Sequence, residues 1–140
     1  MKAFAATALL LLCAPSAWAD CADLNSQALP KKAALQAAAD EYKNSVVSHL
    51  RDMKSNKDQP PLVAIAEGVV ETSKMIAALD DMIDYLHSVL DAGCFGKDAN
   101  QWSMAIAKFE TQRDGMRKER RLYIDTVSMM AKVEDKPRNR

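Results

Sequence analysis

Glycine and proline are scarce in the body of this chain, and their scarcity argues against a β-sandwich. The 140 residues include four glycines and five prolines, whereas alanine, leucine, methionine and charged residues of high helix propensity abound. An excess of either charge is also missing, because 19 basic residues balance 19 acidic ones. This balance argues against a general nucleic-acid-binding protein. Motifs of a catalytic nucleophile are lacking too, so we expect no enzyme.

Residues 1–19 have the pattern of a cleavable secretory signal peptide. Lys2 provides the positive start, and residues 3–14 form an apolar run that is too short to span a bilayer of ~30 Å. Ala17 and Ala19 provide the two small side chains that signal peptidase accepts, which predicts cleavage near Ala19. A buried N-terminal helix is the alternative, but the run has no polar face to turn toward water. We therefore expect an exported chain, periplasmic or secreted.

Such a cleavage would leave two of the three cysteines, because Cys13 belongs to this leader segment. In an exported protein, the remaining Cys21 and Cys94 predict one intramolecular disulfide. Free or intermolecular thiols are the alternative. Lipid attachment at Cys21 is excluded, because Asp20 stands where a small side chain would be needed.

The rest of the chain shows the apolar periodicity of long amphipathic helices over residues 30–55, 61–92 and 98–132. Gly93 is placed to end the second helix in a left-handed conformation, and Asp98 has the side chain of an N-cap for the third. No later stretch is long and uncharged enough for a transmembrane anchor. Because short connections make sequential helices antiparallel neighbours, the sequence predicts an all-α, antiparallel three-helix bundle.

Gly68 leaves a second arrangement open. A glycine inside a helix costs roughly 1 kcal/mol relative to alanine, so the helix predicted for 61–92 either bends there or divides, which would give a four-helix variant. In both arrangements residues 20–133 form one helical domain, and the polar residues 134–140 form a disordered tail. An up-down-up topology also brings Cys21 near the end of the second helix, in agreement with the predicted disulfide.

The third predicted helix combines an apolar row with a basic segment. The row repeats every seven residues and consists of Trp102, Phe109, Met116, Tyr123 and Met130. Arg113 and Arg120 fall beside this core-facing row, where a solvated charge is not expected, and Arg117 and Arg121 lie close to them. We expect these four arginines to anchor a protein partner, because guanidinium groups bind carboxylates in bidentate fashion. The alternative is an ion-paired seam with the acidic second helix.

No metal or cofactor site is expected from the residue pattern. His49 and His87 lie near the ends of two antiparallel helices, roughly 40 Å apart, so they cannot share a metal ion within one chain. The methionines are spread over all three helices, largely at core positions, where they fill space rather than bind copper.

A segment of the second and third predicted helices resembles the last two helices of the small periplasmic four-helix haem cytochromes. The shared features are Ile83-Asp84, a glycine-containing turn, an alanine-rich stretch and Thr111-Gln112-Arg113. The resemblance implies a helical bundle. That family binds haem through a methionine near its first helix and a histidine in its last helix. The last predicted helix here contains no histidine, and the chain has no Cys-x-x-Cys-His motif.

These features together predict a small exported protein-binding module without catalysis, such as a periplasmic inhibitor, a toxin-immunity protein or an accessory subunit of an envelope or secretion machine. Two alternatives stay open. One is a periplasmic haem or metal carrier of helical-bundle type, and the other is a chaperone-like envelope stress protein. Homo-oligomerisation is open as well.

Overall fold

The computed structural model describes residues 15–55, 61–94 and 96–134, and three long helices account for most of them. They are α1 (Pro15–Ser55), α2 (Pro61–Asp91) and α3 (Ala99–Glu134), and a short 3₁₀ helix, η1 (Gly96–Asp98), precedes α3. No strand occurs among these residues, so the predicted all-α class is confirmed. Most of the predicted leader and of the predicted disordered tail lies outside the described residues.

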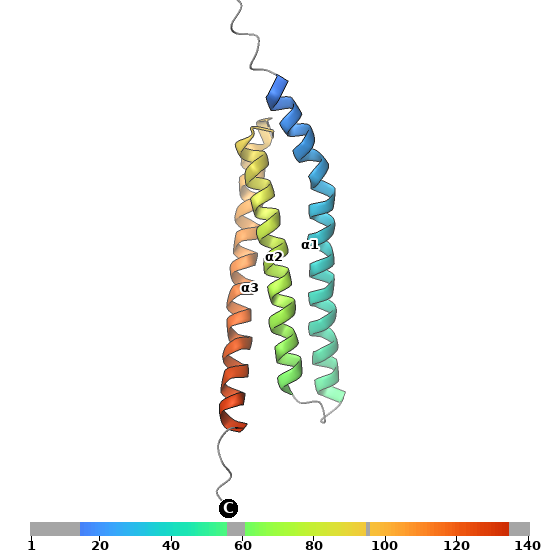
Figure 1. Ribbon diagram of the computed structural model, residues 1–140, viewed down its shortest axis with the longest axis vertical. Helices are drawn as coiled ribbons and strands as arrows, with labels where there is room; N and C mark the ends of the chain where they lie inside the picture. Colours follow the sequence, from blue (N-terminus) through green and yellow to red (C-terminus); the bar gives the residue numbers. More distant parts are fainter. Residues whose placement is uncertain (1–14, 56–60, 95, 135–140) are drawn as a thin grey trace, which may run out of the picture.

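The start of α1 corrects the sequence prediction. We expected the first helix to begin at Pro30, but α1 runs from Pro15 and contains Pro30 in its interior. Proline lacks the N–H that would bond the carbonyl of Ser26, and this loss normally ends or kinks a helix. Here the disulfide between Cys21 and Cys94 holds the turns of α1 that precede Pro30 against the end of α2. The first turns of α1 lean toward the other two helices (Figure 1), as expected for a helix with an interior proline.

α2 runs without interruption through Gly68, so the helix count is three and not four. The hydroxyl of Thr72, which is fully buried, donates to the carbonyl of Gly68 over 2.7 Å. After α2, Gly93 has a φ of 69°, in the left-handed region, as predicted. The amides of Gly93 and Cys94 donate to carbonyls of the last turn of α2, which completes a Schellman motif.

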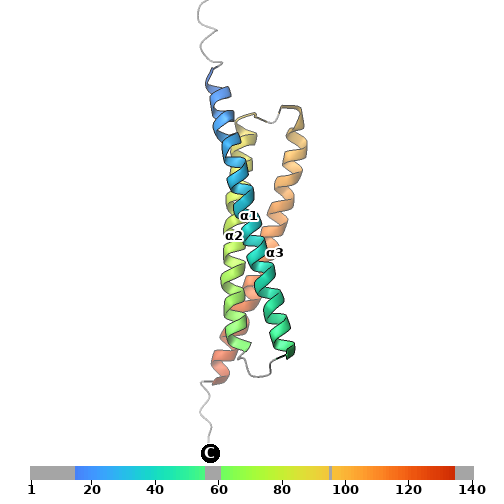
Figure 2. The same cartoon turned by 90° about the vertical axis from the view of Figure 1, so that its right-hand side faces the viewer.

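α2 lies between the other two helices in Figure 1 and packs against both. It runs antiparallel to both, as the colours of Figures 1 and 2 show. Nearly all buried apolar side chains belong to α2. They are Met75, Ile76, Leu79, Met82, Ile83, Leu86 and Val89 of α2, together with Ile106 of α3. Among the described residues, no close backbone contact joins α1 to α3. The core therefore consists of two seams, α1 with α2 and α2 with α3.

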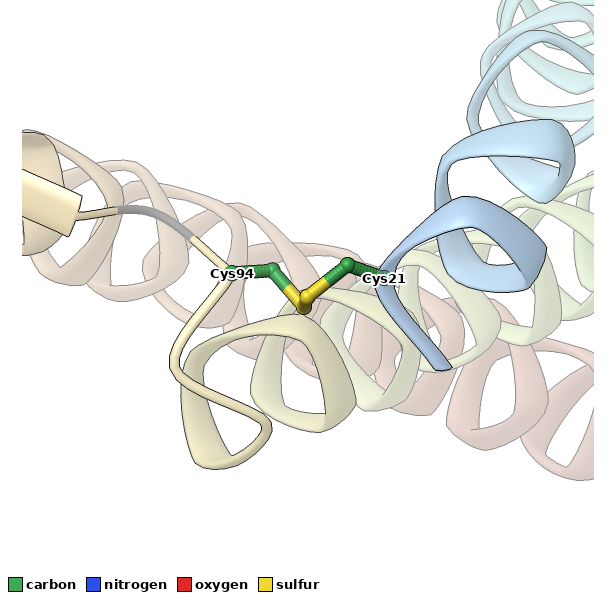
Figure 3. The surroundings of a disulfide bond; sticks show 2 residues. All are labelled: Cys21 and Cys94. Carbon is green, nitrogen blue, oxygen red and sulfur yellow. A yellow bond between two sulfur atoms is a disulfide. The ribbon is translucent and has the colours of Figure 1, made fainter. Parts of the chain in front are cut away.

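A disulfide joins Cys21, near the start of α1, to Cys94, in the turn after α2 (Figure 3). The two Cα atoms are 5.6 Å apart, within the usual range for such a bond, so the predicted pairing is confirmed. The bond ties the N-terminal end of α1 to the end of α2. No helix in the described ranges is both long and apolar enough to cross a membrane.

Removing the disulfide should lower the stability of the fold strongly. A cross-link between positions 73 residues apart stabilises a chain by about 4 kcal/mol on the chain-entropy model. We expect the variant Cys21→Ser/Cys94→Ser to unfold at a clearly lower urea concentration than the oxidised protein, as followed by circular dichroism. Dithiothreitol should shift the wild-type midpoint by the same amount and leave the variant unchanged. Equal wild-type midpoints before and after reduction would contradict this prediction.

Candidate binding groove

A groove of about 730 Å³ lies between α1 and α3, and α2 forms its floor. In the view of Figure 2, α1 and α3 stand apart at the disulfide end of the molecule. The α1 wall consists of Cys21, Asn25, Ala28, Lys32, Leu35, Gln36 and Ala39. The floor consists of Met75, Met82, Tyr85, Leu86, Val89 and Cys94, and the α3 wall of Trp102, Phe109 and Gln112. Most of these side chains are apolar, and a cavity of this volume is large enough to take a ligand.

The walls follow from the helical periodicity of α1 and α3. The wall residues of α1 recur mainly at spacings of three and four, so one stripe of the helix faces the groove. From Cys21 to Ala39 this stripe is roughly 27 Å long at helical rise. On α3, Trp102 and Phe109 belong to the row that we expected to face the core. Trp102 is instead 38% exposed, because it lines the groove rather than a closed core.

A polar cluster connects α1 to α3 beyond the groove. The hydroxyl of Tyr42 on α1 donates to Oε1 of Glu119 on α3 over 2.6 Å, and the hydroxyl of Tyr123 donates to the same oxygen over 2.9 Å. Hydrogen bonds to a charged acceptor are roughly twice as strong as neutral ones. The cluster therefore holds α1 and α3 together at the end of the groove away from the disulfide.

Both tyrosines of this cluster have raised pKa values. Partial burial is the largest cause, and the hydrogen bond to Glu119 and its negative charge add to it. The pKa of Tyr123 rises to about 12, and that of Tyr42 also lies well above its ordinary value. The protonated hydroxyls that donate to Glu119 are thus retained to strongly alkaline pH.

Gly68 belongs structurally to the same region. A Cβ atom at this position would lie 3.1 Å from the ring of Tyr123, which is tighter than ordinary van der Waals contact. The missing side chain therefore lets the Tyr123 ring pack directly on α2. From the sequence, only the cost of Gly68 in helix propensity was visible.

Charged side chains on the α1/α2 seam are paired. Lys31 contacts Asp81, and Lys74 contacts both Glu41 and Glu71 at 3.2 and 3.0 Å. The Lys74–Glu41 pair is exposed to solvent, so it contributes no more than about 1 kcal/mol to stability, whereas the side chain of Glu71 is 15% exposed. The main effect of these pairs is to match α1 with α2 in a single register.

The four arginines predicted to bind a partner divide into two groups. Arg113 and Arg117 both reach Asp80 on α2 at 3.3 Å, so for these two the structure shows the ion-paired seam that was the alternative. Arg120 is partly buried and Arg121 is exposed. Partner binding by any of the four stays a prediction.

Two lysines of the groove have a different environment. Lys32 lines the α1 wall, and Lys108 directly precedes the wall residue Phe109 on α3. Both are exposed, and within the described part of the chain neither takes part in an ion pair. Sequence reasoning did not single them out, because their common groove is formed by helices far apart in the chain.

The described residues contain no group of three histidine, cysteine, aspartate or glutamate side chains that could hold a metal ion. His87 is exposed and lies 4.0 Å from Glu110. The side chain of His49 lies outside the described part of the chain. Met75 and Met82 are the methionines that line the groove.

Comparison of the chain with protein-family models, with curated proteins and with solved structures gives no match.

Removing one hydroxyl from the Tyr42–Glu119–Tyr123 cluster should destabilise the fold and change its response to alkaline pH. We expect Tyr42→Phe to lower the free energy of unfolding by about 1.5 kcal/mol, the size of a hydrogen bond to a charged group. The folded-state pKa of Tyr123, about 12, exceeds the ordinary value of 10.0. This raised pKa stabilises the fold below pH 10, and the stabilisation is lost as the pH rises through 12.

The measurement is urea unfolding at several pH values from 8 to 12. Tyr42→Phe and Tyr123→Phe should each lose less stability above pH 10 than the wild type does, because each variant has one fewer titrating hydroxyl in the cluster. Tyr85→Phe, on the groove floor, is the matched control outside the cluster. The prediction would be contradicted if the free energy of unfolding fell above pH 10 as steeply in both cluster variants as in the wild type.

Proposed function

We propose that this chain is an exported helical binding module whose groove receives an amphipathic helix of a partner protein. The observation that carries the proposal is the groove of about 730 Å³, with walls from α1 and α3 and a floor from α2. The role requires no catalysis, because the three helices act as a scaffold that presents one recessed apolar face. An inhibitor, an immunity protein or an accessory subunit would each work in this way.

The groove has the position of a missing fourth helix. α1 and α3 each pack on α2, yet among the described residues they make no close backbone contact with each other. A helix laid between them, opposite α2, would complete an antiparallel four-helix bundle, whose axes lie about 8–10 Å apart. The α1 stripe from Cys21 to Ala39 would contact about 18 residues of such a helix.

Exposed apolar side chains at the groove support a protein partner. Trp102 on the α3 wall is 38% exposed, and Leu29, next to the wall residue Ala28, is 77% exposed. Tryptophan in a recessed pocket is a frequent anchor of protein interfaces. A partner helix would remove these side chains from water.

Export from the cytoplasm fits the same role. Residues 1–19 have the features of a signal peptide, and the Cys21–Cys94 disulfide is of the kind that persists in oxidising compartments. We place the cleaved protein in the periplasm or outside the cell. Cys21 would then lie next to the new N-terminus.

A carrier and a chaperone would each require properties of the groove that a binding module does not. Haem or metal carriage needs strong ligands, and the lining offers the thioethers of Met75 and Met82 without a histidine. A chaperone would accept unrelated clients with little preference for their charge or sequence. A single partner bound in stoichiometric amount favours the binding module over both.

Filling the groove should abolish partner binding. In Ala28→Phe/Ala39→Phe, two small wall residues of α1 are replaced by large ones that occupy the groove. The matched control, Ala33→Phe/Ala37→Phe, makes the same change at exposed positions outside the lining. Tagged forms of all three proteins would be cross-linked in the native host and their bound proteins quantified by mass spectrometry. We expect the groove variant to lose about ten-fold or more of a partner that the wild type and the control retain. Equal recovery by all three proteins would contradict the proposal.

The exported protein should begin at Asp20 and contain one disulfide. Its intact mass is expected to match residues 20–140 less two hydrogens, measured without reductant. In the variant Ala19→Arg, a large side chain replaces the small one at the predicted cleavage site, so the leader should stay attached. An exported wild-type chain that keeps residues 1–19 would rule out the cleavage.

A further inference from the structure

We infer that the groove selects an acidic helix, a partner segment whose apolar row is flanked by aspartate and glutamate side chains that bind Lys32 and Lys108. This inference deepens the proposed binding function and rests on it. It names the charge that the partner must carry.

Lys32 is part of one wall of the groove, and Lys108 flanks the opposite wall. Lys32 lines the α1 wall. On α3, Lys108 lies one residue before Phe109 and one turn before Gln112, both of which line the groove. The i, i+4 relation to Gln112 puts Lys108 on the same side of α3, at the solvent edge of the wall.

The lysines also lie at similar heights along the groove. Lys31 on α1 and Arg113 on α3 contact adjacent aspartates of α2, at positions 81 and 80. Lys32 directly follows Lys31, and Lys108 lies little more than one turn before Arg113. A helix in the groove would therefore meet one ammonium group on each flank within one or two turns.

Lys32 is the one charged residue of the lining, and Asp40, next to the wall residue Ala39, accepts a hydrogen bond from Gln36 over 3.2 Å. The lining contains a lysine and no aspartate or glutamate. On the α1/α2 seam, by contrast, Lys74 has both Glu41 and Glu71 as partners. In the described ranges Lys32 and Lys108 form no ion pair. Carboxylates on both flanks of an incoming helix would meet these lysines as e and g charges meet in coiled coils.

Two synthetic peptides test the charge preference. Both are helical segments of about 18 residues with the same leucine row, one flanked by glutamates and the other by lysines. Trp18 belongs to the predicted leader, so Trp102 is the one tryptophan of the cleaved protein, and its emission reports occupancy of the groove. We expect the glutamate peptide to bind about ten-fold more tightly at low salt, and the difference to shrink at high salt.

Reversing the two lysine charges should invert this preference. Lys32→Glu/Lys108→Glu is expected to bind the lysine peptide more tightly than the glutamate peptide. Lys118→Glu makes the same change on the side of α3 opposite Phe109, and it should keep the wild-type preference. A double variant that still prefers the glutamate peptide overturns the inference.

The remaining outcomes separate this inference from the proposed function. Equal binding of both peptides, blocked by Ala28→Phe/Ala39→Phe, would overturn the charge preference and leave the binding role of the groove in place. Failure of both peptides to bind overturns the inference, and the cross-linking experiment then decides the function independently. Palmitate that changes the emission of Trp102 when neither peptide does would indicate an acyl chain as the occupant, which also overturns it.

Discussion

The burial of α2 between two helices whose backbones stay apart is the constraint on which the rest of the structure depends. Of the eight buried apolar residues in the described part of the chain, seven lie on α2, so α1 and α3 are held mainly by their contact with it. Two further connections hold the outer helices, the Cys21–Cys94 disulfide at one end and the hydrogen bond from Tyr42 to Glu119 beyond the other end of the groove. Between these connections α1 and α3 separate, and their separation forms the groove.

This arrangement leaves apolar surface in water that a closed bundle would bury. Covering such surface is worth about 25 cal/mol per Å², and Trp102 and Leu29 are among the side chains that would contribute. A partner that binds only the folded chain also stabilises it by mass action. The charges act differently, because exposed lysines add little affinity but strongly affect which partners bind and how fast. In the proposed binding mode, apolar area and selectivity would therefore come from different residues of one groove.

Much of the fold could be predicted from the sequence, because its determinants are local. Apolar periodicity located α2 and α3 to within a few residues, and Gly93 marked the end of α2 through its left-handed conformation. The disulfide was predictable because two cysteines remain once the leader is set aside. The predicted start of α1 was wrong, because proline occurs both in a first helical turn and at a bend inside a helix. The turns of α1 before Pro30 are held by the bond from Cys21 to the distant Cys94, which the local sequence does not reveal.

The groove could not be predicted, because periodicity identifies an apolar face without saying what covers it. The row that contains Trp102 and Phe109 has the same pattern whether it meets α1 in a closed core or lines an open groove. The pairing of Arg113 and Arg117 with Asp80 depends likewise on how α2 and α3 are rotated about their axes. Such rotations depend on the packing of whole helices, so they cannot be predicted from a short sequence motif.

The position of the disulfide has a consequence for biogenesis. In a chain exported N-terminus first, Cys21 reaches the oxidising compartment long before Cys94, so it has to wait as a thiol until α2 has followed. If the leader is cleaved as proposed, Cys13 leaves with it, and Cys21 and Cys94 would have no third cysteine of residues 20–140 to pair with. Maturation by the proposed route would then require oxidation of one dithiol and no rearrangement of disulfides.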